Sequence, residues 1–381
     1  MRHLLFSICI LTTLGACAPS VGHQPMVAPS RAEDIQLHDQ IDRVLTQHGV
    51  TTAAVGVLRG GKLVFEHYQG DAGGVPANAE TRFDVASITK TVAAETLLRM
   101  SADGKIDLDE PLSTYWVDPD IAADPRHQQL TPRLILTHRS GFPNWRFQRA
   151  GGKLAFDREP GTAYGYSGEG FNYLWRAMER KYHTSFPALV DHYLFKPLGV
   201  QTAQLTVDRA DRHNVALGVD ATGRRYDPGC RPGFCWKDGD WSAAGGMLIT
   251  LRDYAKVLSA IGSHAGYGAA IARERDRIVT DRGSESVVDC STTAAICPKM
   301  EGYGLGFVVV DLGSHRIIGH EGGDWSQLTL AYIDLPSRDG LIIFLNVPML
   351  QGVAPMRDLI QLLDPSSPYV SRFGKWASDV R

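Results

Sequence analysis

The spacing of apolar positions predicts a chain with strands near both ends and helices between them. Apolar residues at helical spacing predict a helix over about residues 32–48, and alternating ones around Gly60-Gly61 predict a β-hairpin with a glycine turn. Beyond residue 303 the pattern changes to β-like runs joined by tight turns, followed by a last helix over 353–363. These runs cover residues 305–312, 315–320, 328–334 and 340–347.

The middle of the chain is predicted to be mainly helical. Helical patterns cover residues 87–100, 168–183, 185–195 and 251–261, and another begins at Thr131-Pro132. One sheet built from both termini, with a helical insertion between its halves, is an α+β fold. We therefore expect one domain over residues 33–365. Its parts would be a sheet lobe from 33–86 and 300–365, a helical lobe over 87–299, and a C-terminal tail over 366–381.

Length and composition narrow the class of protein without identifying it. A chain of 381 residues is long enough for two domains or one large one, and its 44% hydrophobic and 21% charged residues are ordinary globular values. Disordered, fibrous and multi-span membrane proteins are thereby excluded. Its 39 basic and 42 acidic residues give a net charge of −3, without the basic excess of nucleic-acid-binding proteins. We expect no nucleic-acid partner.

The first residues have the pattern of an export signal. A basic start is followed by the apolar run Leu4–Leu14, which is too short to span a bilayer as a mature helix. The sequence Leu14-Gly15-Ala16-Cys17 resembles the lipobox of bacterial lipoproteins, in which Cys17 would be lipidated. Residues 1–17 would then be the signal segment and 18–32 a tether, in a periplasmic protein anchored to the membrane. Ala18 after the cysteine resembles the outer-membrane sorting rule. Ordinary signal cleavage near Ala16 or Ala18 is the alternative.

Four of the six cysteines belong to the predicted mature chain beyond Cys17. They form two close pairs, Cys230 with Cys235 and Cys290 with Cys297. Cysteines in even number in an exported protein favour disulfides, and four allow three connectivities, which the sequence leaves open. We expect two local disulfides. A zinc site is the alternative, but the spacing is wider than in zinc motifs and the loops lack matching histidines. No metal is expected.

The tetrad Ser87-Ile88-Thr89-Lys90 is the first candidate for chemistry. A serine hydroxyl becomes a nucleophile when a base takes its proton, and three residues along a helix place Lys90 on the same face as Ser87. The predicted helix N-terminus would favour developing negative charge. A serine that merely caps the helix is the alternative, because this tetrad arises by chance in chains of this length.

Two further segments carry side chains that fit the same chemistry. Tyr166, in a glycine-rich turn, could act as a base or proton shuttle beside a lysine ammonium. His320-Glu321-Gly322-Gly323 ends a predicted strand, where glycines would let a substrate approach the backbone. Taken singly, a core tyrosine, a satisfied or surface histidine and a plain β-turn are the more common explanations of these residues.

Several blocks in order resemble one family over roughly residues 35–348. It is the serine hydrolase family of class C β-lactamases, DD-peptidases, D-aminopeptidases and related esterases. The blocks are Phe83-Asp84-Val85-Ala86-Ser87-Ile88-Thr89-Lys90, Ile135-Leu136-Thr137-His138-Arg139-Ser140-Gly141, Pro160-Gly161-Thr162 through Tyr166-Ser167, Ala244-Gly245-Gly246-Met247 and Tyr303-Gly304-Leu305-Gly306-Phe307. The resemblance implies an antiparallel sheet flanked by helices, a mainly helical lobe, and a site between them.

The resemblance also implies roles for individual residues. Ser87 is similar to the acylated nucleophile, Lys90 to its basic partner and Tyr166 to the tyrosine of a Tyr-x-Asn motif. His320 and Gly322 fall on the family's Lys-Thr-Gly strand. The N–H groups of Ser87 and Gly323 would form an oxyanion hole. The block at 135–141, which contains His138, is expected to shape the helical lobe.

Two departures from the family pattern bear on the substrate. Gly168 stands where the family has asparagine, so a substrate-facing amide is missing unless Glu169 or another group replaces it. His320 stands in place of lysine and supplies less positive charge, although Arg316 on the same strand could contribute some. This shifts the expectation away from an efficient β-lactamase and toward an esterase, amidase or peptidase.

The sequence thus predicts an exported serine hydrolase that cleaves an ester or amide of a small molecule or peptide through an acyl-enzyme on Ser87. A β-lactamase or DD-peptidase activity, and a non-catalytic protein that binds cell-wall peptides, remain alternatives. No cofactor is expected. The chain contains neither a Gly-x-Ser-x-Gly nucleophile elbow nor a His-Glu-x-x-His zinc motif. The oligomeric state stays open.

Overall fold

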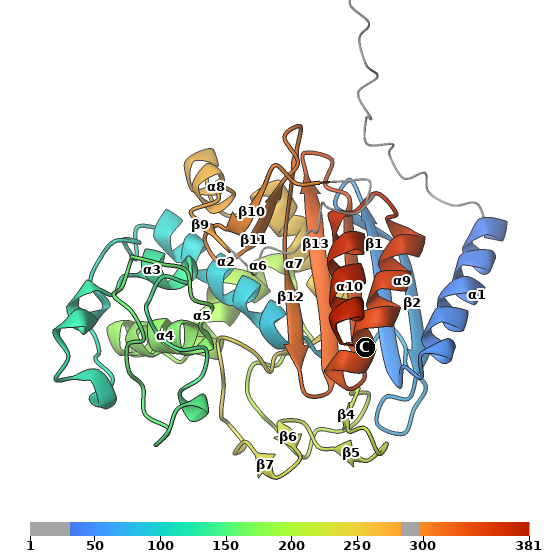
Figure 1. Ribbon diagram of the computed structural model, residues 1–381, viewed down its shortest axis with the longest axis horizontal. Helices are drawn as coiled ribbons and strands as arrows, with labels where there is room; N and C mark the ends of the chain where they lie inside the picture. The colour runs from blue at the N-terminus through green and yellow to red at the C-terminus, as the bar shows by residue number, and fades with distance from the viewer. Residues whose placement is uncertain (1–30, 283–296, 381) are drawn as a thin grey trace, which may run out of the picture.

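A computed structural model describes residues 31–282 and 297–380, and its main feature is an eight-stranded antiparallel sheet (Figure 1). The strand order is β2-β1-β14-β13-β12-β11-β10-β9, so strands from the two ends of the chain pair at β1 and β14. The sheet built from both termini is confirmed. The strands are β1 (Thr52–Arg59), β2 (Lys62–Gly70), β9 (Thr280–Asp281), β10 (Met300–Tyr303), β11 (Val308–Asp311), β12 (Arg316–Asp324), β13 (Gln327–Leu335) and β14 (Gly340–Asn346).

Both faces of this sheet are buried, which explains the continuous apolar runs in the C-terminal part of the sequence. Side chains alternate between faces along a strand. On β14, Ile343 faces the helices α1 (Arg31–Gln47), α9 (Val353–Leu363) and α10 (Pro368–Asp379). Its neighbour Phe344 faces the opposite core, which contains α2 (Thr89–Ala102) and α7 (Leu251–Ser263). The central strands therefore lie between two helical layers.

The residues expected as a C-terminal tail form the helix α10 instead, and this boundary of the sequence analysis was wrong. Tyr369, Phe373 and Ala377 are buried against the sheet and α9, at the i, i+4, i+8 spacing of one helix face. Ser367 caps the helix by accepting a hydrogen bond from the N–H of Tyr369, and Pro368 occupies its first turn. The domain extends to the end of the described chain.

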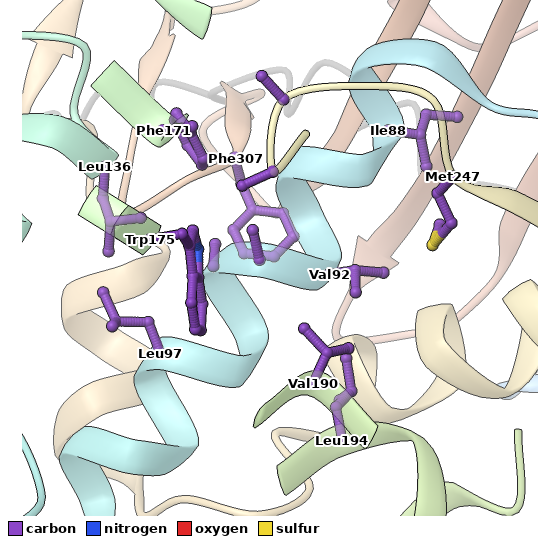
Figure 2. Close-up of a cluster of buried hydrophobic side chains, with 14 of the residues drawn as sticks. Ile88, Val92, Leu97, Leu136, Phe171, Trp175, Val190, Leu194, Met247 and Phe307 are labelled. Carbon is purple, nitrogen blue, oxygen red and sulfur yellow. The ribbon is translucent and has the colours of Figure 1, made fainter. Parts of the chain in front are cut away.

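The helical lobe packs around α2, which begins at Thr89, directly after the short turn that carries Ser87. Figure 2 shows the buried cluster that includes Val92 and Leu97 of α2, Trp175 of α4 and Leu194 of the π-helical segment η6. All four side chains are fully buried. The helices of this lobe are α3 (Pro132–Leu136), α4 (Gly168–Tyr182), α5 (Phe186–Val190), η6 (Asp191–Phe195) and α6 (Lys196–Leu198). Short 3₁₀ segments, η2 (Leu112–Thr114), η3 (Pro119–Ile121), η4 (Pro125–Gln129) and η5 (Arg146–Gln148), connect them.

The two lobes share elements more closely than the sequence boundaries at 87 and 299 imply. α2 and α7 contribute to the core on one face of the sheet, and β9 extends its edge. Near the site, β3 (Arg82–Asp84) pairs with β8 (Leu248–Thr250). The remaining elements are the short hairpins β4 (Gly218–Val219) with β5 (Arg225–Tyr226) and β6 (Cys230–Arg231) with β7 (Phe234–Cys235), the helix α8 (Ala269–Arg275), and η8 (Met349–Gly352) before α9.

The cysteine predictions are met in part. A disulfide joins Cys230 to Cys235 across the β6–β7 hairpin. Cys297 is also disulfide-bonded, while Cys290 and the predicted lipidation site Cys17 lie outside the described residues, as does the signal segment.

Within residues 31–282 and 297–380, no helix is long and apolar enough to cross a membrane. The same part of the chain holds no cluster of three or more histidine, cysteine or acidic side chains suited to a metal ion.

Candidate active site

Ser87 lies in a single 3₁₀ turn, η1 (Ala86–Ile88), between strand β3 and helix α2. The preceding Ala86 has a positive φ of 45°, a conformation that costs energy for a residue with a side chain. Its N–H donates a hydrogen bond of 2.8 Å to the carboxylate of Asp84, which stabilises this turn. The Thr329 hydroxyl of β13 donates to the Val85 carbonyl at 3.0 Å. The serine is therefore held at the boundary of both lobes.

Lys90 lies one helical turn beyond Ser87 and is fully buried. Its ammonium nitrogen Nζ lies 3.1 Å from Ser87 Oγ and 2.7 Å from the Ala244 carbonyl oxygen. Burial lowers the pKa of Lys90 to about 7, because the charged form loses its hydration. Near neutral pH a large share of this amine is unprotonated, so it can accept the proton of the serine hydroxyl.

The ring of Tyr166 lies beside the Lys90 amine. The Lys90 Nζ is 4.8 Å from the centre of the Tyr166 ring, which stacks on His138 at a centroid distance of 4.4 Å. The ring of Tyr303 is 6.3 Å from that of Tyr166 and crosses His138 at right angles. The structure thus brings together Ser87, Lys90 and Tyr166, as the sequence predicts, in an aromatic surrounding that keeps water from the lysine.

His138 contacts the candidate site, which the sequence analysis did not anticipate. It is buried, and its Nδ1 accepts the N–H of Ser167 at 3.1 Å, so its proton resides on Nε2. Burial and the nearby Lys90 ammonium hold its pKa well below the usual range. A neutral imidazole that stacks on Tyr166 and bonds to the next residue fixes the position of that tyrosine. His138 belongs to the Ile135–Gly141 block, but nothing in the sequence of that block indicates that the histidine contacts the site.

His320 is present at the site but carries no positive charge. Its Nδ1 contacts the Glu321 carbonyl oxygen, which can only accept, so Nδ1 holds the proton. Its Nε2 accordingly accepts the Tyr303 hydroxyl at 2.8 Å. Burial, with the Lys90 ammonium next in importance, lowers the pKa of His320 to about 3. Arg316 does not replace that charge, because it lies exposed at the far end of β12 and pairs with Asp311.

The two glycines of the third motif have different roles. A Cβ on Gly322 would lie 2.4 Å from the Val85 carbonyl oxygen and 2.3 Å from Thr329 Oγ1. Gly322 therefore lets β12 approach the Ser87 turn. This is a packing role, whereas the sequence analysis expected the glycines to make room for the substrate. Gly323 is exposed and, like Ser87, lines both of the cavities described below.

The space beside Gly168 is filled by Trp145. A Cβ on Gly168 would lie 2.4 to 2.7 Å from three carbons of the Trp145 indole, so no side chain fits there. Glu169 does not supply the missing group, because its carboxylate binds the backbone N–H and the guanidinium of Arg146. The side-chain oxygen of Asn144 accepts the Gly168 N–H at 3.0 Å.

Two cavities meet at Ser87. The aromatic cavity, of about 800 Å³, is lined by five tryptophans, Trp116, Trp145, Trp236, Trp241 and Trp325. The charged cavity, of about 920 Å³, is lined by His320 and Tyr303 and by eight charged side chains, Arg149, Asp157, Arg158, Arg282, Glu321, Arg372, Lys375 and Asp379. Five residues line both, namely Ser87, Asn144, Gln148, Tyr166 and Gly323. A substrate at Ser87 can extend into two chemically different spaces.

The chain matches the Beta-lactamase family model over residues 37–360. It is 25% identical over 285 residues to the esterase EstB of Burkholderia gladioli, covering 59% of this chain and 69% of the esterase. It is 26% identical over 230 residues to the D-alanyl-D-alanine carboxypeptidase/endopeptidase AmpH of Escherichia coli K12, covering 54% of this chain and 57% of that protein.

Two solved structures share the fold. One is the octameric penicillin-binding protein homologue from Pyrococcus abyssi, with a TM-score of 0.68 at 19% identity, covering 88% of this chain and 78% of that one. The other is the D-amino acid amidase from Ochrobactrum anthropi SV3, with a TM-score of 0.65 at 20% identity, covering 87% of this chain and 99% of the amidase. The expected α+β architecture is confirmed by these matches. With a family match over most of its length, the chain belongs to the Beta-lactamase family of serine hydrolases.

Proposed function

We propose that this protein cleaves an ester or amide through an acyl-enzyme on Ser87. The observation that carries the proposal is the contact of 3.1 Å between Ser87 Oγ and the buried Lys90 amine, whose pKa is lowered to about 7. A lysine of ordinary pKa would be protonated at neutral pH and could not take the serine proton. Burial provides the base that this nucleophile needs.

The reaction follows from these positions in two halves. Lys90 takes the hydroxyl proton of Ser87, and Oγ bonds to the substrate carbonyl carbon. The N–H groups of Ser87 and Gly323 would stabilise the negative oxygen, each typically by about 3 kcal/mol. Lys90, with Tyr166 beside it, passes the proton to the leaving group as its bond to carbon breaks. Water then attacks the acyl-enzyme while Lys90 takes its proton. Lys90 returns this proton to Ser87 Oγ as the bond from Oγ to the acyl carbon breaks, which releases the acid and regenerates both groups.

The neutral state of His320 supports an ester or amide substrate over a β-lactam. A fixed cation at this strand position would attract a carboxylate beside the scissile bond, whereas a histidine with a pKa of about 3 offers only its hydrogen bonds. The proposal therefore expects slow cephalosporin hydrolysis. A peptidase activity is the second candidate, because the arginines and Lys375 of the charged cavity could hold the carboxylate of a peptide end.

The decisive experiment is covalent labelling of Ser87. Purified protein would be treated with a fluorophosphonate and analysed by peptide mass spectrometry, and turnover would be measured on aryl esters, D-amino-acid amides, muropeptides and a chromogenic cephalosporin. We expect an adduct on Ser87 and ester or amide turnover that Ser87→Ala abolishes while the thermal unfolding midpoint is kept. Full activity of Ser87→Ala contradicts the proposal. A protein that binds muropeptides but forms no adduct would be the non-catalytic alternative.

We also propose that the protein is exported and anchored to the bacterial membrane by a lipid on Cys17. The apolar segment ending in Leu14-Gly15-Ala16-Cys17 is the basis, and the Cys230–Cys235 disulfide fits an oxidising compartment. Metabolic labelling with an alkyne fatty acid should mark the wild type and not Cys17→Ser, which should appear in the soluble periplasmic fraction. Equal labelling of both proteins would contradict lipidation at this residue.

A further inference from the structure

Aromatic side chains are concentrated at one of the two cavities beside Ser87. Five of the seven tryptophans of the chain line the aromatic cavity, against one in the charged cavity. Two of the five rest on glycines, because a Cβ on Gly168 would overlap the Trp145 indole and one on Gly218 would lie 2.5 Å from the Trp325 ring. The backbone thus makes room for an indole ring at two places along this wall.

The mouth of the aromatic cavity carries exposed aromatic rings as well. The side chains of Phe147 and Trp236, which line the cavity, are 59% and 43% exposed. Phe147 stacks on Trp145 at 5.9 Å, and the Arg231 guanidinium lies 5.6 Å from the Phe147 ring. Large apolar surface that stays in water costs free energy, which a bound apolar group would recover.

Two features indicate which part of a substrate this cavity would hold. The charged cavity is lined by five basic and three acidic side chains, which suit a polar leaving group. The aromatic cavity has an excess of acidic side chains, with seven carboxylates against three arginines, and these disfavour a negatively charged occupant. The carboxylates are those of Asp84, Asp118, Glu169, Asp208, Asp227, Asp240 and Asp324.

We propose that the aromatic cavity is the acyl-group site and that it selects substrates with an uncharged aromatic acyl group. This inference rests on the proposed acyl-enzyme function, since it assigns one side of the cleaved bond to each cavity. The tryptophan rings would stack on the aromatic group, while Phe147 and Trp236 would close over its outer end. The volume of about 800 Å³ accommodates a group far larger than acetyl.

Two esters with the same leaving group test the proposal. p-Nitrophenyl 3-phenylpropanoate and p-nitrophenyl acetate differ only in the acyl part. We expect kcat/KM for the phenylpropanoate to be at least about tenfold higher in the wild type. Phe147→Ala should lower that ratio roughly fivefold, through a higher KM for the phenylpropanoate. Val64→Ala is the control, because Val64 is an apolar side chain that is 46% exposed and lines neither cavity.

Equal kcat/KM values for the two esters, or the same loss in Phe147→Ala and Val64→Ala, would overturn the acyl-site assignment. A binding measurement separates this from a failure of the proposed function. The Ser87→Ala protein is titrated with 3-phenylpropanamide, with propanamide as control, and tryptophan fluorescence is recorded. Quenching by the phenyl compound alone supports an aromatic site even if no ester is cleaved. No quenching together with normal acetate turnover leaves the hydrolase intact and removes the aromatic site.

Asn144 supports a second inference from a separate observation. The oxygen of its side-chain amide accepts the Gly168 N–H at 3.0 Å. The other group of the same amide is therefore the NH₂ group, which can only donate. Its backbone carbonyl accepts the Glu169 N–H, which fixes the residue from a second side. No partner for the NH₂ group exists among the described residues, and Asn144 lines both cavities with Ser87 and Tyr166. We infer that this NH₂ group donates a hydrogen bond to the substrate.

Two substitutions separate this role from a purely structural one. Asn144→Asp keeps an oxygen for the Gly168 N–H but removes the donor, whereas Asn144→Ala removes both. We expect each to lower kcat/KM roughly tenfold, with Asn144→Asp keeping the unfolding midpoint of the wild type. Gln129→Ala is the control, because this exposed amide lines neither cavity. Full activity of either Asn144 variant, or an equal loss in Gln129→Ala, would overturn the inference.

Discussion

The two cavities that meet at Ser87 differ in both surface and charge. The aromatic cavity has five tryptophans and an acidic excess, seven carboxylates against three arginines. The charged cavity has one tryptophan, and five basic side chains against three acidic ones. Under the proposed function, this difference fits a substrate with an apolar acyl end and a polar or anionic leaving end.

The residues between the cavities are those that both substrate ends would share. Ser87, Tyr166 and Gly323 line both, and Lys90 is buried behind them. Changes here should affect every substrate alike, whereas changes on one wall should affect one end of the substrate.

The largest effect is expected from Lys90, because it serves both cavities. Lys90→Ala should lower kcat/KM about a thousandfold for acetyl and phenylpropanoyl esters alike, which is within the range of general base catalysis. Lys90→Arg should fail similarly, since a guanidinium stays protonated. Steady-state kinetics on both esters give the comparison. A loss confined to one ester would mean that the two cavities do not share this base.

The pH dependence should be the next largest effect and should also be common to both esters. Lys90 must be unprotonated to act, and its pKa is lowered to about 7, so kcat/KM should fall about tenfold per unit below pH 7 and level off above it. Asp84, half-buried beside the Ser87 turn, has its pKa raised by burial to about 7 as well. Asp84→Asn, which can still accept the Ala86 N–H, should keep the profile. A profile that flattens in this variant would assign the titration to Asp84 instead.

The fold and the three central residues were predictable from the sequence because both depend on local patterns. Apolar runs bounded by turn residues predicted the strands of the sheet, and the spacing of Ser87 and Lys90 within one helix turn predicted their contact. The resemblance to the family added Tyr166 and the strand with His320. Each of these residues lies in a predicted element or in an ordered block of the family.

The composition of the two cavities could not be predicted in the same way. Asn144 and Trp145 reach Gly168 from a loop more than twenty residues away, and neither position has a pattern that indicates a site. The role of His138 follows from its hydrogen bond with the backbone N–H of Ser167, which only the structure shows. The helix α10 was overlooked because Tyr369, Phe373 and Ala377 are few and follow a proline and serines. Contacts made by loops depend on tertiary packing, which a single sequence does not display.

A moderate effect on stability should come from filling the space that Trp145 occupies. Gly168→Ala should destabilise the protein by about 2 kcal/mol, because the new Cβ overlaps the indole. In a Trp145→Ala background the same change should cost under about 0.5 kcal/mol, which a double-mutant cycle by urea denaturation would show. Gly170→Ala is the control, since a Cβ there meets only ordinary contacts from 3.4 Å. Equal costs of Gly168→Ala in both backgrounds would contradict the assigned packing.

The smallest effect is expected from opening the β6–β7 hairpin at the rim of the aromatic cavity. The Cys230–Cys235 disulfide closes a short loop that carries Arg231 and is followed by Trp236. The Cys230→Ser, Cys235→Ser double variant leaves every catalytic group in place, so acetate hydrolysis should be unchanged. Because Trp236 and Arg231 would lose a fixed position, the preference for the phenylpropanoate ester should fall about threefold, through KM. Treatment of the wild type with dithiothreitol should have the same effect. If the preference persists in the double variant while Phe147→Ala reduces it, the rim acts through the loop at Phe147 and the hairpin contributes only its outer surface.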